Sequence, residues 1–322
     1  MRLASDVPRA VVAAHLRAGT WTRVGYGTYV STQDARGEPR STPGLLGAGR
    51  RPGGGESRAG NDETHADRRT LALARIAGTA RRLRAPVVFS HVSAALLWGL
   101  PLWRTPAQVH LVHPSRASAR SDATVVRHTA HLDDDDVRIV AGVRVTSLER
   151  TLVDCAALLE PVAGLVVADA ALAAGADPED VARRAHDARR TRHAVRLRAV
   201  VEHADDGAES PLESASRFVV LRDGLPRPQT QVRVQTRLGA VWSDWGWEEF
   251  SLLAEYDGRA KYSEQAAFMA EKRRHDALVE AGQRVIRVVA EDLRGSALTA
   301  RLLPLLPDAV CRARRPRPEL MH

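Results

Sequence analysis

The first part of the chain alternates between short ordered patterns and one long polar stretch. Residues 8–18 place apolar side chains at helical spacing and end at Gly19, which predicts a short helix. Residues 19–30 alternate polar and apolar positions around two glycines, the pattern of a β-hairpin. A helix followed by a hairpin is the second half of a winged helix-turn-helix, so a truncated form of that fold is expected. Residues 32–66 are rich in Gly, Pro, Ser and charge, which predicts a disordered linker.

The middle of the chain has the pattern of a compact α/β unit. Residues 86–101 read as a short strand, then a helix capped by Ser90. Helical periodicity and short apolar alternation recur on both sides of this segment. The other predicted helices are 69–83, 147–159 and 161–174, and the other predicted strands are 107–114, 123–130, 137–142 and 142–147. Residues 178–203 predict a basic helical connector with a solvated face.

The last third predicts a helix, three antiparallel strands, a helix and a strand. Ser210 as N-cap, Pro211 and Glu213 form a capping-box pattern at the start of the first helix. Arg217 lies four residues after Glu213 and is in position to pair with it. A strand is predicted at 229–236, and residues 240–258 predict two further strands joined by a turn around Gly246 to Glu249. A helix at 264–282 and a strand at 283–293 follow.

Charge and composition narrow the choice of partners. The 322 residues carry a net charge of +8 and a sequence pI of about 10.3, which suits a polyanion such as DNA. A general preference for arginine is an alternative explanation, because only Lys261 and Lys272 among the 47 basic residues are lysines. The sequence shows no run of about 18 apolar residues and no signal peptide. Cys155 and Cys311 match no metal or redox spacing, so a cytoplasmic protein without a membrane partner is expected.

Three acidic residues of the last third are candidates for one metal site. Asp244 and Glu255 fall on consecutive strands, so their side chains can meet across the hairpin. Glu213 can reach the same point from the preceding helix, although capping also explains it completely. Carboxylate oxygens are the ligands that Mg²⁺ or Mn²⁺ prefers, and the ion would neutralise their mutual repulsion.

Phosphodiester hydrolysis is the chemistry that such a site suits. A divalent ion polarises the phosphoryl oxygen and lowers the pKa of a water, while an ammonium stabilises developing negative charge. Lys261 is close enough along the chain for that role, and Lys272 can reach in from the next helix. Taken singly, each residue also has a structural explanation: Asp244 beside a turn, Glu255 and Asp257 at a solvated strand end, and the lysines on the surface.

Histidines and a run of aspartates in the middle region raise a second question about metals. The histidines are His91, His110, His113, His128 and His131. Their spacings match no zinc signature and no cysteine joins them, so we interpret them as scattered surface or capped side chains. Residues 133–136, four consecutive aspartates, are interpreted as a solvated acidic turn.

The last third resembles the very-short-patch-repair-like endonuclease domains of the PD-(D/E)XK superfamily. The matching stretches are SPLES (210–214), SDW (243–245), LLAEYDG (252–258), EKRRHDAL (271–278) and GQRVIRVVAEDL (282–293). The resemblance implies an αβββαβ nuclease fold with Glu213, Asp244 and Glu255 as metal ligands. It places Asp257 and Glu271 nearby.

Three further positions are compared with that family's pattern. Arg274 falls on its arginine, which would contact phosphate or hold the acidic cluster. Asp257 stands where the superfamily has lysine, as it also does in the closest relatives. Lys261 stands where those relatives have histidine, so it keeps a cation but loses a proton acceptor at neutral pH.

The first 160 residues resemble the AbiEi-like abortive-infection type IV antitoxins. The matching stretches are GTWTRVGYGTYV (19–30), FSHVSAALLWGLP (89–101) and RVTSLERTLVDCA (144–156). The resemblance implies a winged-helix DNA reader followed by an α/β domain, with a toxin or defence-operon protein as partner. The first helices of that reader are absent, so the recognition helix would hold only Arg9 and Arg17 as DNA contacts.

Together these patterns predict a multidomain α+β / α/β chain. The expected parts are a partial winged helix (1–31), a linker (32–66), an AbiEi-like α/β domain (67–177), a basic helical connector (178–207), an endonuclease domain (208–300) and a basic tail (301–322). The expected function is Mg²⁺- or Mn²⁺-dependent DNA hydrolysis in defence or repair. The alternatives are a non-enzymatic DNA-binding regulator of antitoxin type, with a degenerate nuclease domain, and a scaffold with neither activity.

Overall fold

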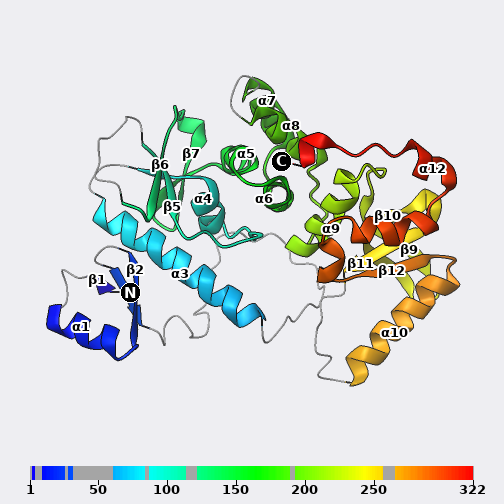
Figure 1. Cartoon of the computed structure of the whole chain (residues 1–322), viewed down its shortest axis with the longest axis horizontal. Helices are drawn as coiled ribbons and strands as arrows, with labels where there is room; N and C mark the ends of the chain where they lie inside the picture. The colour runs from blue at the N-terminus through cyan, green and yellow to red at the C-terminus, as the bar shows by residue number, and fades with distance from the viewer. Residues whose placement is uncertain are drawn as a thin grey trace. The chain divides into compact units, whose positions relative to one another are not determined.

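The computed structural model describes residues 2–3, 9–25, 28–31, 61–83, 87–113, 122–188, 193–256 and 265–321. The chain folds as two compact units, the first from Met1–Val87 and Thr105–Ala130 and the second from Val88–Arg104 and His131–His322. Helices and strands occur in both units (Figure 1). The architecture is therefore mixed α+β, with parallel and antiparallel strand pairs, as the sequence predicted.

The first unit combines a small antiparallel sheet, a long helix and a parallel strand pair. Its elements are β1 (Arg2–Leu3), α1 (Arg9–Arg17), β2 (Trp21–Gly25), β3 (Thr28–Ser31), α3 (Asn61–Arg82), β5 (Val109–His113) and β6 (Val125–Thr129). Strand β3 lies between β1 and β2, and α3 packs against β2, β3 and β5. The predicted helix and hairpin are present, but α3 begins before the expected start at Arg69. Residues 32–60 of the predicted linker lie outside the described part of the chain.

The second unit begins with three short strands and a layer of helices. Strand β8 (Val143–Thr146) pairs in parallel with β4 (Val88–Phe89) and antiparallel with β7 (Val137–Val140). The helices are α4 (His91–Leu97), α5 (Leu148–Leu158), α6 (Pro161–Ala173), α7 (Pro178–Asp187) and α8 (Ala194–His203). Helix α5 packs against α4, α6, α7 and α8, so it is the centre of this layer.

The connector predicted over 178–207 differs from its expected solvated form. It contains two helices, α7 and α8, and both pack against α5. Val181 and Ala185 of α7 are buried, as are Leu197 and Val200 of α8. The arginines between these apolar positions masked the buried face in the sequence, most of all in α7, where two of the ten residues are buried.

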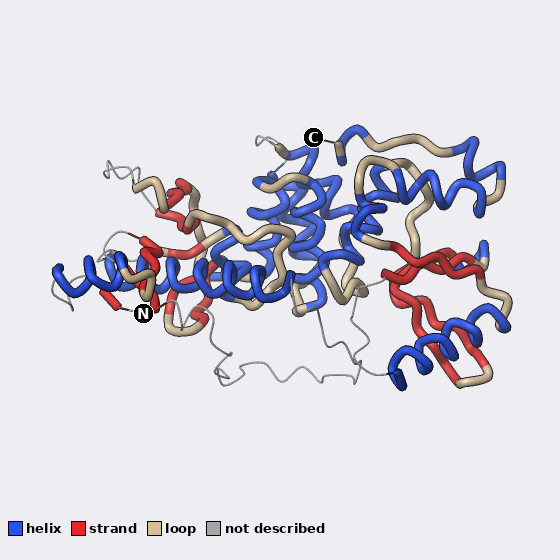
Figure 2. The backbone as a smooth tube through the Cα atoms, turned by 60° about the horizontal axis from the view of Figure 1, so that its bottom comes forward, coloured by secondary structure: helices blue, strands red, loops and turns tan. Residues whose placement is uncertain are grey.

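A four-stranded sheet sandwiched between helices completes the second unit (Figure 2). Its order is β12-β11-β10-β9, from β9 (Gln229–Thr236), β10 (Gly239–Trp247), β11 (Leu252–Tyr256) and β12 (Arg284–Val288). The first three strands are antiparallel, and β11 and β12 are parallel. Helices α9 (Pro211–Arg222) and α11 (Ala297–Leu302) share one core with Trp245 and Trp247, whereas Leu278 of α10 (Gln265–Glu280) packs with Val232, Val234 and Leu253. The predicted order of elements is thus observed.

Arg217 does not pair with Glu213 as the sequence suggested. Its side chain is fully buried and its Nη2 lies 2.8 Å from both carboxylate oxygens of Asp169 on α6. Its Nη1 donates to the carbonyl oxygen of His203 at 2.8 Å. The ion pair therefore connects α9, which leads into the four-stranded sheet, with the helical layer.

Residues 301–321, the described part of the predicted basic tail, contain secondary structure and packed side chains. They contain α12 (Asp308–Ala313) and a short 3₁₀ turn, Pro318–Leu320, and Leu320 is buried. The Arg317 backbone N–H donates to the Arg222 carbonyl at 2.9 Å, and the Arg317 guanidinium donates to the carbonyl of Leu221. Arginine side chains in this segment thus satisfy carbonyl groups at the C-terminal end of α9.

Candidate functional site

The hairpin of β10 and β11 brings Asp244 and Glu255 side by side. Trp245 is paired with Ala254, so the next antiparallel position joins Asp244 to Glu255. The Oδ2 atom of Asp244 accepts a hydrogen bond from the Tyr256 backbone N–H at 2.6 Å. This part of the sequence prediction, which rested on alternation and a short turn, agrees with the geometry.

Glu213 approaches this hairpin from the first turn of α9. The hydroxyl of Ser210 accepts from the Glu213 N–H at 3.2 Å, which confirms the N-cap. The Glu213 carboxylate reaches back to accept from the N–H of Glu209 at 2.8 Å. Glu213 therefore has a capping role, and its carboxylate is close enough to Asp244 for the charge of Asp244 to raise its pKa.

The pKa values of two of these carboxylates, Glu213 and Asp244, are raised. Burial, and then the charge of Asp244, raises the pKa of Glu213 to about 7. Burial also raises the pKa of Asp244 to about 6, and the charge of Glu255 adds to this while Arg274 and the Tyr256 N–H oppose it. Carboxylates in this state are stabilised by any additional positive charge that reaches them.

Glu213, Asp244 and Glu255 are called the acidic group below, and Glu255 is the most buried of the three. It is 7% exposed, and its Oε1 lies 2.8 Å from Arg274 Nη2. That contact is close enough for ion pairing but lacks hydrogen-bond geometry, so Oε1 has no hydrogen-bond partner among the described residues. A buried oxygen acceptor beside two further carboxylates fits the donor chemistry of a hard divalent ion.

Arg274 contacts Glu255 of the acidic group and holds it in place through further contacts with the backbone and with Glu271. Its Nη2 donates to the Trp242 carbonyl at 2.6 Å, and its Nη1 lies 3.6 Å from Glu271. Glu271 in turn pairs with Arg287 at 2.6 Å. Of the two roles that the family resemblance left open for Arg274, these contacts favour holding the acidic cluster over contacting phosphate.

The carboxylate oxygens of the acidic group do not converge on one point. Among the described residues, the oxygens of Glu213, Asp244 and Glu255 do not all come within 4.8 Å of one another. A shared ion, with ligand distances of about 2.0–2.6 Å, therefore requires their side chains to turn inward. Asp257 and Lys261 lie outside the described residues, and Lys272 is exposed on α10. The assignment of these residues to catalysis stays a prediction.

The predicted DNA contacts of the first unit lie on α1. Arg17 is exposed, and its Nε donates to the Ala13 carbonyl at 3.4 Å. Arg9 begins the helix, and its side chain lies outside the described residues. The ring of His15 stacks on Trp21 of β2 with ring centroids 4.3 Å apart, which fixes α1 against the hairpin.

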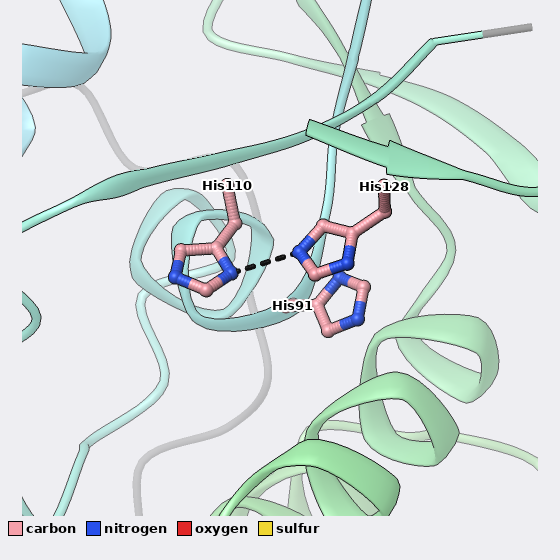
Figure 3. Close-up of side chains that lie close together, drawn as sticks. All are labelled: His91, His110 and His128. Atoms are coloured by element: carbon pink, nitrogen blue, oxygen red, sulfur yellow. Dashed lines mark hydrogen bonds between the residues drawn. The ribbon is translucent and has the colours of Figure 1, made fainter. Parts of the chain in front are cut away.

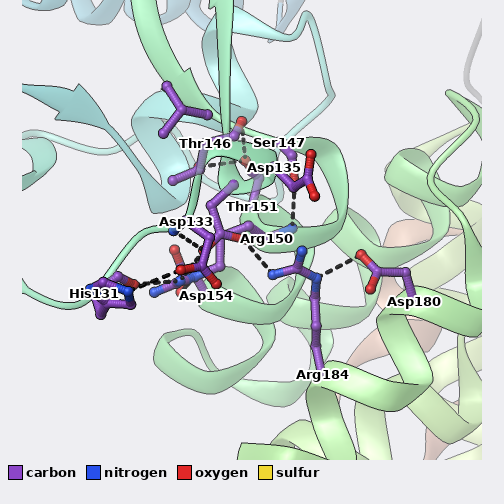
Figure 4. A network of polar contacts seen from close by, with 12 residues as sticks. His131, Asp133, Asp135, Thr146, Ser147, Arg150, Thr151, Asp154, Asp180 and Arg184 are labelled. Atoms are coloured by element: carbon purple, nitrogen blue, oxygen red, sulfur yellow. Dashed lines mark hydrogen bonds and ion pairs between the residues drawn. The ribbon is translucent and has the colours of Figure 1, made fainter.

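A buried network of charges in the second unit was missed at the sequence level (Figure 4). Asp136, interpreted above as part of a solvated turn, is 4% exposed and pairs with Arg150 and Arg184. Arg150 also donates to Asp154 at 2.9 Å, and Arg184 donates to Asp180 at 2.7 Å. Burial raises the pKa of Asp154 to about 6 although Arg150 lowers it.

The signal that could have found this network is local. Arg150 and Asp154 are four residues apart on a helix that is mainly apolar, and Asp180 and Arg184 repeat that spacing on α7. Charges inside an apolar helix are seldom buried without a partner. The partner of both arginines, Asp136, comes from a distant turn, which a local pattern does not reveal.

Comparison with known proteins identifies the class of the middle region. Residues 87–203 match the family described as AbiEi antitoxin C-terminal domain. This match supports the AbiEi-like prediction for that range, and the nuclease resemblance of the C-terminal sheet stays a prediction. Within the part of the chain that the structure describes, no helix has the length and apolar character to cross a membrane.

Two related proteins extend the similarity beyond that family match. They are "Uncharacterized protein MT2308" and "Uncharacterized protein Rv2248", from the CDC 1551 / Oshkosh and ATCC 25618 / H37Rv strains of Mycobacterium tuberculosis. Each is 28% identical over 204 residues, which cover 63% of this chain and 74% of the relative. No solved structure matches the chain.

Proposed function

We propose that the chain is a DNA-binding protein of the toxin–antitoxin kind whose C-terminal sheet carries a divalent-ion site for DNA hydrolysis. The first half of this proposal is supported by the antitoxin family match over residues 87–203. The net charge of +8 is of the sign that a DNA partner requires. The toxin partner is implied by the family alone.

A mobility-shift assay tests the DNA-binding half. The full chain is titrated onto the DNA that precedes its own gene and onto scrambled DNA of equal length, with EDTA present. Retardation of the first DNA at lower protein concentration is expected. Equal affinity for both would contradict sequence-specific regulation, and absence of any complex at low salt would remove DNA from the proposal.

The hydrolytic half depends on the acidic group formed by Glu213, Asp244 and Glu255. Its support is one observation: the pKa values of Glu213 and Asp244 are both raised, first by burial and then by the charge of a neighbouring carboxylate, Asp244 for Glu213 and Glu255 for Asp244. These three carboxylates are the residues that would hold Mg²⁺ or Mn²⁺. When bound, the ion supplies polarisation of a phosphoryl oxygen and a lowered pKa for a water.

The protein's own groups have separate tasks in this proposal. Arg274 and the Tyr256 N–H keep Glu255 and Asp244 in place. Glu213, whose pKa is raised to about 7 by burial and by the charge of Asp244, would be deprotonated when it holds the ion. Lys272 is exposed and offers a positive charge to the phosphate backbone.

Plasmid nicking with Mg²⁺ or Mn²⁺ tests the hydrolytic half. The wild type is compared with Glu255→Ala, and with Glu249→Ala as a control at an exposed acidic position between β10 and β11. Loss of nicking in the first variant alone is expected. Equal activity of wild type and Glu255→Ala would eliminate this site. Intact DNA binding without nicking in the wild type would leave the non-enzymatic regulator as the function.

A further inference from the structure

The first unit brings two histidines together that the sequence keeps 18 positions apart. His110 lies on β5 and His128 on β6, and the parallel register pairs His110 with Val126 and Val112 with His128. The Nδ1 atom of His110 lies 3.0 Å from the Nε2 atom of His128 (Figure 3). The ring centroids are 5.2 Å apart, with 25° between the ring planes. His91, also drawn in Figure 3, belongs to the second unit.

Both imidazoles are in the form that binds metals. Burial, and then the charge of His128, lowers the pKa of His110 to about 4. Burial also lowers the pKa of His128. Near neutral pH both rings are therefore neutral, and one ring donates its N–H to the lone pair of the other. Both residues are half-buried.

The separation of the two nitrogens suits a shared ligand. With metal–nitrogen distances of about 2.0–2.1 Å, a 3.0 Å separation corresponds to a nitrogen–metal–nitrogen angle of roughly 90–100°. That angle fits adjacent positions of a square-planar or octahedral ion, and a slight widening fits a tetrahedral one. Imidazole is a preferred donor for Ni²⁺, Cu²⁺ and Zn²⁺, so the geometry and donor type agree.

We propose that His110 and His128 form a chelating pair for a divalent late transition ion such as Ni²⁺, Cu²⁺ or Zn²⁺. Metal binding displaces the proton that now lies between the two ring nitrogens, either to the other nitrogen of its own ring or to solvent. The remaining coordination positions are available to water or other donors. This proposal does not depend on the function suggested above, because the histidines and the acidic group belong to different units.

Calorimetric titration of the metal-free full chain, without a histidine tag, with NiCl₂ and separately with ZnCl₂ tests the pair. One site per chain is expected for the wild type. His128→Gln keeps a polar side chain that can hydrogen-bond to His110 but is a poor ligand, and we expect its affinity to fall by roughly tenfold or more. His113→Ala, on the same strand as His110, is the matched control and should leave affinity unchanged.

Circular dichroism and thermal unfolding of each variant separate ligand loss from misfolding. Absence of binding in the wild type overturns the proposal. So does equal affinity in folded His128→Gln, or an equal loss in His113→Ala.

Discussion

At the scale of single residues, buried charge is this protein's most informative feature. Arg217 is 0% exposed, and both Asp169 oxygens lie against its Nη2, yet its Nε has no hydrogen-bond partner among the described residues. Burial raises the pKa of Asp169, while Arg217 opposes that shift. Such a pair is stable only while both partners are present, because either charge alone would remain buried and uncompensated.

We therefore expect Arg217→Met to lower the free energy of unfolding by about 3–5 kcal/mol, because it leaves Asp169 unpaired. Urea unfolding followed by circular dichroism measures the change. The double variant Arg217→Met with Asp169→Leu should recover much of the loss, since no charge stays buried. Arg312→Ala removes an exposed arginine and should change stability little. A loss in the double variant as large as in the single one would contradict this account.

Glu213 predicts a dependence of stability on pH. Its folded pKa, about 7, lies above the ordinary value of 4.5, so folding favours the protonated form and stability falls as pH rises between these values. Glu213→Gln removes the charge but keeps an oxygen acceptor. We expect it to raise stability by about 1–3 kcal/mol at pH 8 and to have little effect at pH 4.

Thermal unfolding across this pH range, with exposed Glu249→Gln as control, measures the effect of Glu213→Gln. A gain that is equal at both ends of the range would show that the carboxylate's charge is not its cause. Magnesium should stabilise the wild type more than Glu213→Gln if the acidic group binds the ion.

At the scale of elements, local patterns predicted helices and strands well and their partners poorly. The cap at Ser210 is a local sequence signal, so the start of α9 could be predicted. Alternation around Asp244 and Glu255 is also local, so strands β10 and β11 and the proximity of these two side chains could be predicted. The partner of Arg217 lies 48 positions away on α6, and a nearby Glu213 offered a plausible local substitute. The pairing of His110 with His128 depends on the register of two parallel strands, which no local pattern specifies.

Two glycines provide a matched test of whether the C-terminal segment, residues 303–321, packs against the end of α9. Gly224 ends α9 with φ +82°, and a Cβ there would meet the carbonyl oxygen of Arg315 at 2.1 Å. Gly239 has a similar φ of +94°, but a Cβ there would meet nothing within 4 Å. We expect Gly239→Ala to cost about 1 kcal/mol in conformational strain.

Gly224→Ala should cost clearly more, because the segment around Arg315 must also move. Thermal unfolding compares the two variants, and limited proteolysis reports exposure of residues 303–321. Equal costs, with no change in proteolysis, would mean that this segment does not press on the end of α9.

At the scale of the whole molecule, the arginine-rich surface determines how DNA binding should respond to salt. Each phosphate contact that releases a counterion adds about 0.9 to the slope of log affinity against log salt. Lys272 and Arg273 are both exposed on α10. We expect the double change to alanine to reduce that slope by about 2, with little change from Arg312→Ala. Fluorescence anisotropy with a labelled duplex at several salt concentrations measures both, and an unchanged slope would place the DNA away from α10.

The ion pair between α6 and α9 also has an evolutionary consequence. The antitoxin match ends at residue 203, so Asp169 lies inside the matched range and Arg217 lies beyond it. A recombination event between these two positions would give one descendant an inward-facing carboxylate and the other an inward-facing guanidinium, each without its counterion. New C-terminal modules grafted onto such a helical layer are therefore expected to arrive with a matching arginine, or to succeed only in lineages that have already lost the aspartate.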